Sequence, residues 1–142
     1  MEIIEATNYR DDIIALLSAE KLPTSDLPES LENFSVIIEN GGLVAAIGLE
    51  IYGSYGLLRS LVVRPDSRHQ NIGGKLITQI ENLAAAQKLK AIFLLTETAP
   101  DYFSHKGYHI ITRAEMPVEV RQSSEFSHVC PQTAIAMKKN LE

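Results

Sequence analysis

The chain has 142 residues, of which 45% are hydrophobic and 22% are charged, and its formal net charge is -5. This length and balance are typical of a soluble globular protein, and we expect a single domain over residues 1–142. A negative net charge without a basic run argues against nucleic acid and anionic membranes as partners. No apolar run approaches the roughly 20 residues of a membrane span. The single cysteine, Cys130, excludes an internal disulfide and a cysteine-based zinc cluster, and we expect a reduced cytoplasm as the setting.

The start of the chain predicts a strand followed by a helix. Residues 1–6 carry an apolar pair typical of a short strand, and Thr7 or Asn8 is placed to cap the helix after it. The helix is expected to end near Lys21, because the two prolines of residues 22–28 cannot continue it. Its apolar positions fall on one face, at Ile13, Leu16 and Leu17.

A hairpin follows. Two apolar stretches, residues 34–39 and 43–52, flank Asn40-Gly41-Gly42, which is a strong hairpin signal. A turn at residues 53–56 leads into a β-branched apolar strand, residues 57–63, which ends before Pro65. The early hairpin argues against a flavodoxin-like α/β domain, in which strands and helices alternate from the start.

The second half of the chain alternates helices and strands. A long helix begins at Ile72, and its apolar face is formed by Leu76, Ile77, Ile80, Leu83 and Ala84. Strands are expected at residues 91–95, 108–113 and 130–138, with a helix between the first two. The expected fold class is α/β (α+β), with a central mixed, mostly antiparallel sheet and helices on both faces.

The turn before the long helix has the properties of a phosphate site. It directs unpaired backbone N–H groups and the positive end of a helix dipole at one spot. A Walker loop is excluded, because Leu76 follows Gly74-Lys75 and Arg68 stands where the first glycine belongs. A dinucleotide fingerprint is excluded, because Gly73 and Gly74 are the only glycines there.

The string Arg68-His69-Gln70-Asn71-Ile72-Gly73 resembles the acetyl-CoA loop of the GNAT family of N-acetyltransferases, Gln/Arg-x-x-Gly-x-Gly/Ala. It departs from that pattern at Asn71, where the family has Gly, and asparagine is well tolerated where φ is positive. Residues 91–108 are similar to the family's next segment, a strand and an Asn followed by Ala-x-x-Phe-Tyr-x-x-x-Gly-Phe. Thr96 stands at the Asn position, and Tyr102-Phe103 has the aromatic pair in swapped order.

The resemblance implies that acetyl-CoA enters where the strand of residues 57–63 and the strand after the long helix splay apart. Backbone groups of Leu61 and Val63 would bind its pantetheine arm, and the Val63 N–H would polarise the thioester carbonyl. No metal site is expected. The implied donor-binding residues are Leu61, Val62, Val63, Arg68, His69, Gln70, Asn71, Ile72, Gly73, Gly74, Thr96 and Phe103.

The general acid and base are less well marked. The family's usual acid is the tyrosine of the aromatic pair, and Phe103 occupies that position. Its neighbour Tyr102 points about 100° elsewhere on a helix. Either Tyr102 is reoriented, or another residue acts, or the CoA thiolate leaves unassisted, which we favour. Glu97 is the first candidate base because it follows the strand beside the acyl arm, and Glu125 and His105 come next. Cys130 is interpreted as a buried structural thiol.

The implied function is transfer of an acetyl group from acetyl-CoA to the primary amine of a small molecule. Residues 117–137 resemble the tail of a GNAT branch associated with arsenic-resistance operons, whose proposed acceptors are amino-acid-like organoarsenicals. An amino-acid acceptor needs a cation for its carboxylate, for which Arg59, Arg113 and Arg121 are candidates. The alternative is an acyl-CoA-binding sensor or interaction domain without turnover, favoured by the missing tyrosine and by Asn71. The oligomeric state, a homodimer included, is left open.

Overall fold

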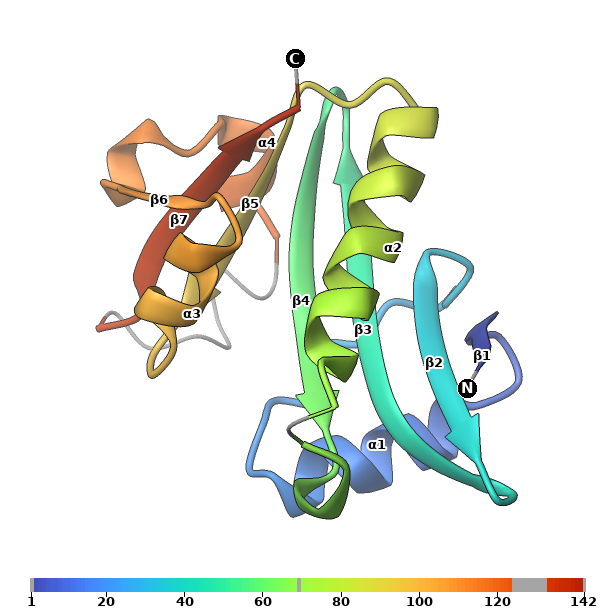
Figure 1. Ribbon diagram of the computed structural model, residues 1–142. Coiled ribbons are helices and arrows are strands. Elements are labelled where there is room, and N and C mark those ends of the chain that lie inside the picture. Colours follow the sequence, from blue (N-terminus) through green and yellow to red (C-terminus); the bar gives the residue numbers. More distant parts are fainter. Residues whose placement is uncertain (1, 69, 124–132, 142) are drawn as a thin grey trace.

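The computed structural model describes residues 2–68, 70–123 and 133–141, which form one seven-stranded sheet with helices on both faces (Figure 1). The strands are β1 (Glu2–Glu5), β2 (Phe34–Glu39), β3 (Gly42–Tyr52), β4 (Tyr55–Val63), β5 (Ala91–Thr96), β6 (His109–Ile111) and β7 (Ile135–Asn140). The helices are α1 (Arg10–Ala19), α2 (Ile72–Ala86), α3 (Pro100–His105) and α4 (Val118–Arg121), with short 3₁₀ turns at Pro65–Ser67 and Arg113–Glu115. No described helix has both the length and the apolar character needed to cross a membrane.

The sheet has the order β1-β2-β3-β4-β5-β7-β6. Among the described strand pairs, β4 and β5 are parallel and the others are antiparallel, which confirms the predicted mixed, mostly antiparallel sheet. The parallel pairing is short, because it runs only from Tyr55 opposite Ala91 to Leu57 opposite Phe93. Beyond that point β4 and β5 diverge (Figure 1). The predicted splaying of these two strands is therefore confirmed.

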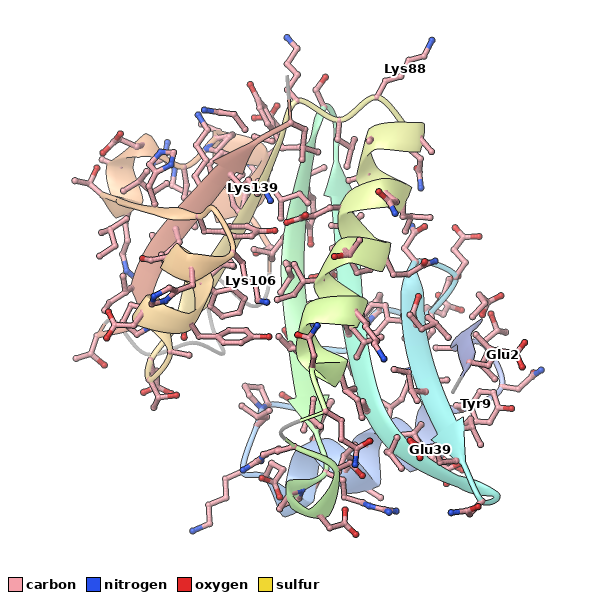
Figure 2. The ribbon with its side chains drawn as sticks, viewed as in Figure 1. Glu2, Tyr9, Glu39, Lys88, Lys106 and Lys139 are labelled. Carbon is pink, nitrogen blue, oxygen red and sulfur yellow. The ribbon has the colours of Figure 1, made fainter. Side chains whose placement is uncertain are left out.

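Side chains of α2 and β7 connect the two halves of the sheet beside this divergence. The Tyr108 hydroxyl and Lys139 Nζ both donate to Glu81 Oε2 of α2, at 3.1 and 3.0 Å. Lys139 also donates to the Lys106 carbonyl at 3.0 Å, and both lysines lie between the halves (Figure 2). Burial and the Glu81 carboxylate raise the pKa of Tyr108 far above its usual range, so its phenol stays a donor. We call Glu81, Tyr108 and Lys139 the Glu81 network.

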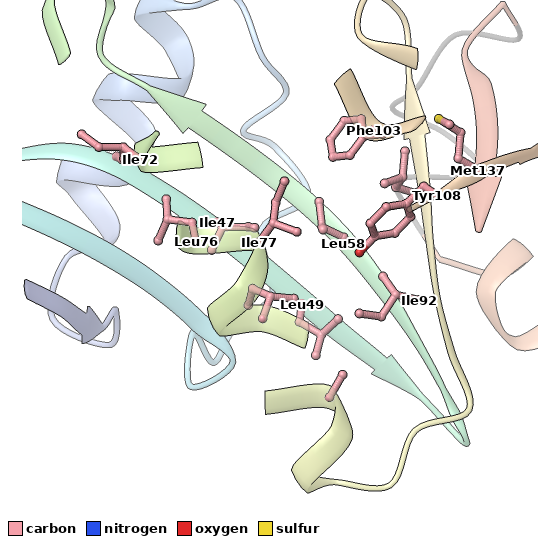
Figure 3. Close-up of a cluster of buried hydrophobic side chains, with 14 of the residues drawn as sticks. Ile47, Leu49, Leu58, Ile72, Leu76, Ile77, Ile92, Phe103, Tyr108 and Met137 are labelled. Carbon is pink, nitrogen blue, oxygen red and sulfur yellow. The ribbon is translucent and has the colours of Figure 1, made fainter. Parts of the chain in front are cut away.

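The core is divided between the two faces of the sheet. On one face, α2 packs its predicted apolar side against β3 and β4, and Phe103 and Tyr108 extend this cluster toward β7 (Figure 3). On the other face, α1 covers Ala46 and Val62 with its predicted apolar residues, which are all buried. The segment containing α4 covers the remaining part, over β4, β5 and β7. The predicted helices on both faces are thus confirmed.

The predicted hairpin is also confirmed. Asn40 and Gly41 have φ angles of 52° and 78°, so both central residues of the turn are left-handed, as the turn favoured between twisted strands requires.

Two predictions at other turns were wrong. Tyr55 and Gly56 are paired in β4, because Gly53, at φ 64°, allows Gly53-Ser54 alone to close the turn. Neither Thr7 nor Asn8 caps α1, since a backbone bond from Tyr9 N to Ala6 O places both inside a preceding turn.

The last two strands differ from their predicted bounds. The strand expected at residues 108–113 is confined to β6, because Arg113 begins a 3₁₀ turn. A capping box starts that turn, in which Glu115 Oε1 accepts bonds from the Thr112 N–H and hydroxyl at 2.9 and 3.0 Å. The strand expected at residues 130–138 is β7, which begins at Ile135, and Cys130 lies outside the described residues.

Gly48 provides a test of the packing between β2 and β3. An ideal Cβ at Gly48 would lie 2.4 Å from Cε2 of Phe34, whose ring is buried against the sheet. Gly48→Ala should therefore lower the free energy of unfolding by about 1–3 kcal/mol, because the ring must move within a packed core. Urea unfolding followed by circular dichroism measures this loss.

Gly42 is the matched control in the same strand, since the nearest atom to its ideal Cβ lies at 3.7 Å. Gly42→Ala should change the stability by less than about 0.5 kcal/mol. Equal losses in the two variants would contradict the assignment of the strain to the Phe34 ring.

Candidate active site

The middle of β4 contains a bulge. Gly48 pairs with Arg59 and Ala46 pairs with Val62, so Ile47 of β3 lies opposite both Ser60 and Leu61. Ser60 has a φ of 58°, which is the left-handed conformation of one such bulge type. The bulge falls in the part of β4 that has separated from β5, and it redirects the backbone of residues 60–63.

The Val63 N–H faces the side from which β5 has diverged. Arg64, the next residue, donates its N–H to Val44 O of β3 at 2.8 Å. Because successive N–H groups of a strand point to opposite sides, the Val63 N–H points away from β3. The Val63 carbonyl also lies on this outer side, where Arg68 Nε binds it at 3.1 Å. This geometry is consistent with the predicted role of Val63 as a donor to a carbonyl oxygen.

Two adjoining hollows follow the divergence of β4 and β5. The larger has a volume of about 830 Å³ and lies between the loop after α1, the bulge of β4 and the segment from β5 to α3. The smaller, of about 520 Å³, lies between the end of β4 and the start of α2. The residues that line both are Glu20, Leu22, Leu61, Thr98 and Tyr102.

The smaller hollow has the character of an anion site. Asn71 has a φ of 56°, as its place in the predicted loop requires, and it is followed directly by the 15-residue helix α2. The first N–H groups of this helix have no partner within it, so they and the dipole favour negative charge there. Arg68, Asn71, Ile72 and Gly73 line this hollow together with Leu61, Val62 and Val63. Gln70 is exposed and Gly74 is buried without lining it, and His69 lies outside the described residues.

The two glycines at the start of α2 make room for Tyr102 of α3, for Lys106, which directly follows α3, and for Asn71, whose Oδ1 would lie 2.4 Å from an ideal Cβ at Gly74. An ideal Cβ at Gly73 would lie 2.6 Å from the Tyr102 hydroxyl, and one at Gly74 would lie 2.9 Å from Lys106 Nζ. Lys106 also lies 5.5 Å from the centre of the Tyr102 ring, within cation–π range. The sequence did not single out Lys106, because it is brought to α2 only by the folding of β5 and α3 onto the sheet.

The two residues of the aromatic pair, Phe103 and Tyr102, differ in burial and in their contacts. Phe103 is only 7% exposed and packs edge-on against Tyr108, although it reaches the wall of the larger hollow. Tyr102 is 38% exposed and lines both hollows, with its hydroxyl over the first turn of α2. Partial burial raises the pKa of Tyr102 above its ordinary value of 10.0. A protonated phenol is thus present at the site although the family's usual position holds phenylalanine.

The candidate bases Glu97 and His105 differ in whether they line a hollow. Glu97 is exposed and lines the larger hollow, just beyond the end of β5. Thr96 lines it as well, and its hydroxyl accepts the Ala99 N–H at 3.1 Å. His105 is not among the residues that line either hollow, and its Nδ1 lies 2.7 Å from the Asp101 carbonyl, so its role as a base stays a prediction. Glu125 lies outside the described residues.

Arg59 is bound to carboxylates of the protein itself. Its guanidinium lies 2.7 and 2.8 Å from the two carboxylate oxygens of Asp26 and 3.2 Å from Glu50 Oε1, and the side chain is 1% exposed. It therefore ties the loop after α1 to the bulge, and the expectation that it binds an acceptor carboxylate was wrong. Arg113 and Arg121 do not line either hollow. Within the described ranges, no cluster of three His, Cys, Asp or Glu side chains could hold a metal ion.

Residues 30–110, more than half of the chain, match the family model described as "Acetyltransferase (GNAT) domain". The chain belongs to the GNAT acetyltransferase family. Among curated relatives, the amino-acid acetyltransferase of Ectopseudomonas mendocina (strain ymp) is 33% identical over 93 residues, which are 64% of this chain and 22% of that protein. The amino-acid acetyltransferase of Pseudomonas fluorescens (strain Pf-5) is 37% identical over 84 residues, 58% of this chain and 19% of that protein. The matched part of this GNAT chain thus spans about a fifth of the length of these relatives.

Solved structures share the fold over the whole chain. Rv2747 from Mycobacterium tuberculosis, solved in complex with CoA, has a TM-score of 0.83 and 22% identity, with full coverage of both chains. N-acetylglutamate synthase from Neisseria gonorrhoeae, complexed with coenzyme A and N-acetyl-glutamate, has a TM-score of 0.81 and 16% identity. That match covers 99% of this chain and 35% of the synthase. At these identities the likeness confirms the GNAT fold.

The contact between Gly73 and Tyr102 can be tested by a double-mutant cycle. Alanine is favoured over glycine inside a helix by about 1 kcal/mol, but in this chain the new methyl group would meet the Tyr102 hydroxyl. Gly73→Ala should therefore stabilise the Tyr102→Phe variant more than the wild type, with a coupling energy of about 0.5–1 kcal/mol. Urea unfolding of the four proteins measures the coupling, and a value near zero would show that the hydroxyl does not rest on Gly73.

Proposed function

We propose that this protein is an N-acetyltransferase that moves an acetyl group from acetyl-CoA to the primary amine of a small, amino-acid-like molecule. The observation that carries the proposal is the bulged, unpaired side of β4 lying directly beside the N-terminus of α2. This arrangement offers a strand edge for an extended amide-containing arm and a positive helix end for a diphosphate. Membership of the GNAT family supports it.

The residues present fit the donor. The amides at the start of α2 and the Arg68 guanidinium would hold the diphosphate, with Asn71 and Gly73 keeping the backbone accessible. The outer side of β4 at Leu61 and Val63 would bind the pantetheine amides. Thr96 and Phe103, on the wall of the larger hollow, would face the acyl end of this path. Acetyl-CoA supplies the activated thioester, and the chain supplies its orientation.

Three residues would carry the chemistry. Val63 would donate its outward N–H to the thioester oxygen, where negative charge develops during attack. Glu97, exposed at the larger hollow, would take the proton of the acceptor ammonium. Tyr102 would return a proton to the leaving sulfur, since its position between the hollows and its raised pKa keep a phenolic proton available. The structure thus favours Tyr102 over unassisted departure of the thiolate.

The acceptor class rests on the relatives and on the charges of the larger hollow. The curated relatives are amino-acid acetyltransferases, and the hollow is lined by the exposed Lys21 and Glu97, of opposite charge, and by the partly exposed Glu20. These suit the carboxylate and the ammonium of an amino acid. A role in arsenic resistance rests on the tail, of which residues 124–132 lie outside the described residues. We place the reaction in the cytoplasm, with small molecules as the only partners.

The proposal is tested by mixing the protein with acetyl-CoA and a panel of α-amino acids and simple amines while following free CoA thiol. We expect thiol release that depends on the acceptor and mass spectra showing an added acetyl group on its nitrogen. Tight acetyl-CoA binding without thiol release for any acceptor would instead indicate an acyl-CoA-binding module. Absence of acetyl-CoA binding would contradict the proposal altogether.

Tyr102→Phe tests the general acid. Loss of proton donation should lower kcat by about 10²-fold or more, with little change in the KM for acetyl-CoA. Because the acid acts in its protonated form and its pKa is raised, wild-type kcat should fall only above pH 10, as the phenol ionises. Tyr9→Phe, a distant control on the α1 side, should leave kcat unchanged. A Tyr102→Phe enzyme with wild-type kcat would show that the thiolate leaves unassisted.

A further inference from the structure

Glu20 occupies the boundary between the two halves of the proposed site. It directly follows α1, its side chain is 22% exposed, and it is one of the residues that line both hollows. Its Oε1 lies 2.5 Å from Nη2 of Arg68, across 48 residues of sequence. No motif marked it, because this ion pair depends on the packing of α1 beneath β4.

Arg68 links Glu20 to the smaller hollow, in which we propose that the diphosphate of the donor binds. Its side chain is 49% exposed, and it binds the Val63 carbonyl through Nε and Glu20 through Nη2. The same guanidinium lines the smaller hollow beside the N-terminus of α2. A diphosphate held at that helix end carries more negative charge than one carboxylate, and it would compete with Glu20 for Arg68.

A carboxylate released from Arg68 needs another cation, and the larger hollow lies on its other side. Arg59, in that hollow, is already bound by Asp26 and Glu50. Lys21 also lines that hollow, but the proposed function assigns it to the carboxylate of the acceptor. The remaining source of positive charge is the acceptor, because an aliphatic amine is an ammonium at neutral pH.

We propose that Glu20 couples the two substrates: it competes with the donor's diphosphate for Arg68 and, once displaced, binds the ammonium group of the acceptor. This role rests on the proposed function and assigns a specificity-determining residue to it. Glu20 therefore selects acceptors that are cationic beside the reacting carbonyl. Occupation of the donor site improves the acceptor site, since it supplies the carboxylate.

The donor half of the proposal is tested by calorimetry with acetyl-CoA. Glu20→Gln removes the competitor, so acetyl-CoA should bind about two- to fivefold more tightly, as expected for loss of an exposed ion pair. Arg68→Gln should bind it more weakly, and Glu20→Gln should have no effect in the Arg68→Gln background. Acetyl-pantetheine, which has no diphosphate, should bind wild type and Glu20→Gln equally.

Asp12→Asn is the matched control, because it removes one negative charge from an exposed position of α1. It should leave the affinity for acetyl-CoA unchanged. Glu20→Asp keeps the charge but shortens the reach to Arg68, so it should also bind acetyl-CoA more tightly. This second variant keeps the test decisive if Glu20→Gln does not fold.

The acceptor half is tested by steady-state kinetics with the best acceptor of the panel. Glu20→Gln should raise the KM for the acceptor about tenfold, through loss of a charge-assisted hydrogen bond, while it lowers the KM for acetyl-CoA. A purely structural defect would not move the two constants in opposite directions.

The coupling role is overturned if a folded Glu20→Gln binds acetyl-CoA no more tightly, if Asp12→Asn tightens it equally, or if the gain persists without Arg68. It is also overturned if the KM for the acceptor is unchanged. If wild type does not bind acetyl-CoA at all, the proposed function itself fails.

Discussion

The short parallel pairing of β4 with β5 is the constraint on which the rest of the molecule depends. Three residue pairs join the strands, and beyond Leu57 the outer side of β4 has lost its partner. Backbone N–H and C=O groups that are buried without a hydrogen-bond partner cost free energy unless a ligand or water binds them. The bulge at Ser60 then changes the register with β3 by one residue and aims the last residues of the strand toward α2. A strand edge and a helix end thus meet at one place without any specialised side chain.

Two groups of charged side chains lie beside the two hollows, and they differ in how deeply they are buried. Beside the larger hollow, Arg59 is buried with Asp26 and Glu50, a group that carries one net negative charge and joins the loop after α1, the bulge and β3. Breaking such a cluster leaves an unpaired buried charge, so it fixes the wall of the larger hollow more firmly than an exposed pair would. Beside the smaller hollow, the Arg68 and Glu20 side chains are partly exposed, so their ion pair is weak and costs little to break. Burial therefore separates charges that hold the scaffold from charges that are open to other partners.

The sequence predicted the features that depend on local rules. The Asn40-Gly41 turn, the apolar face of α2 and the left-handed Asn71 each follow from the backbone preferences and spacing of neighbouring residues. The features it missed depend on segments far apart in the chain. Arg59 looked available because Asp26 is 33 residues away, and Tyr102 looked misdirected because its place over Gly73 is set by how α3 docks on α2. No sequence signal marks the bulge either, since Ser60 is neither glycine nor asparagine.

The Glu81 network is important because it lies where the two halves of the sheet diverge. From Leu57 to Val63 the outer side of β4 runs for about 20 Å, at about 3.3 Å per residue, beyond its pairing with β5, while β3 stays paired with its inner side. A tilt of about 3° between β4 and β5 over that length changes their separation by about 1 Å, an error that can cost about 10²-fold in rate when reacting groups must align. Glu81, Tyr108 and Lys139 tie α2, which packs over β3 and β4, to the half of the sheet that contains β7, without lining either hollow. The width of the gap between β4 and β5 is consequently set in part by residues that lie outside both hollows.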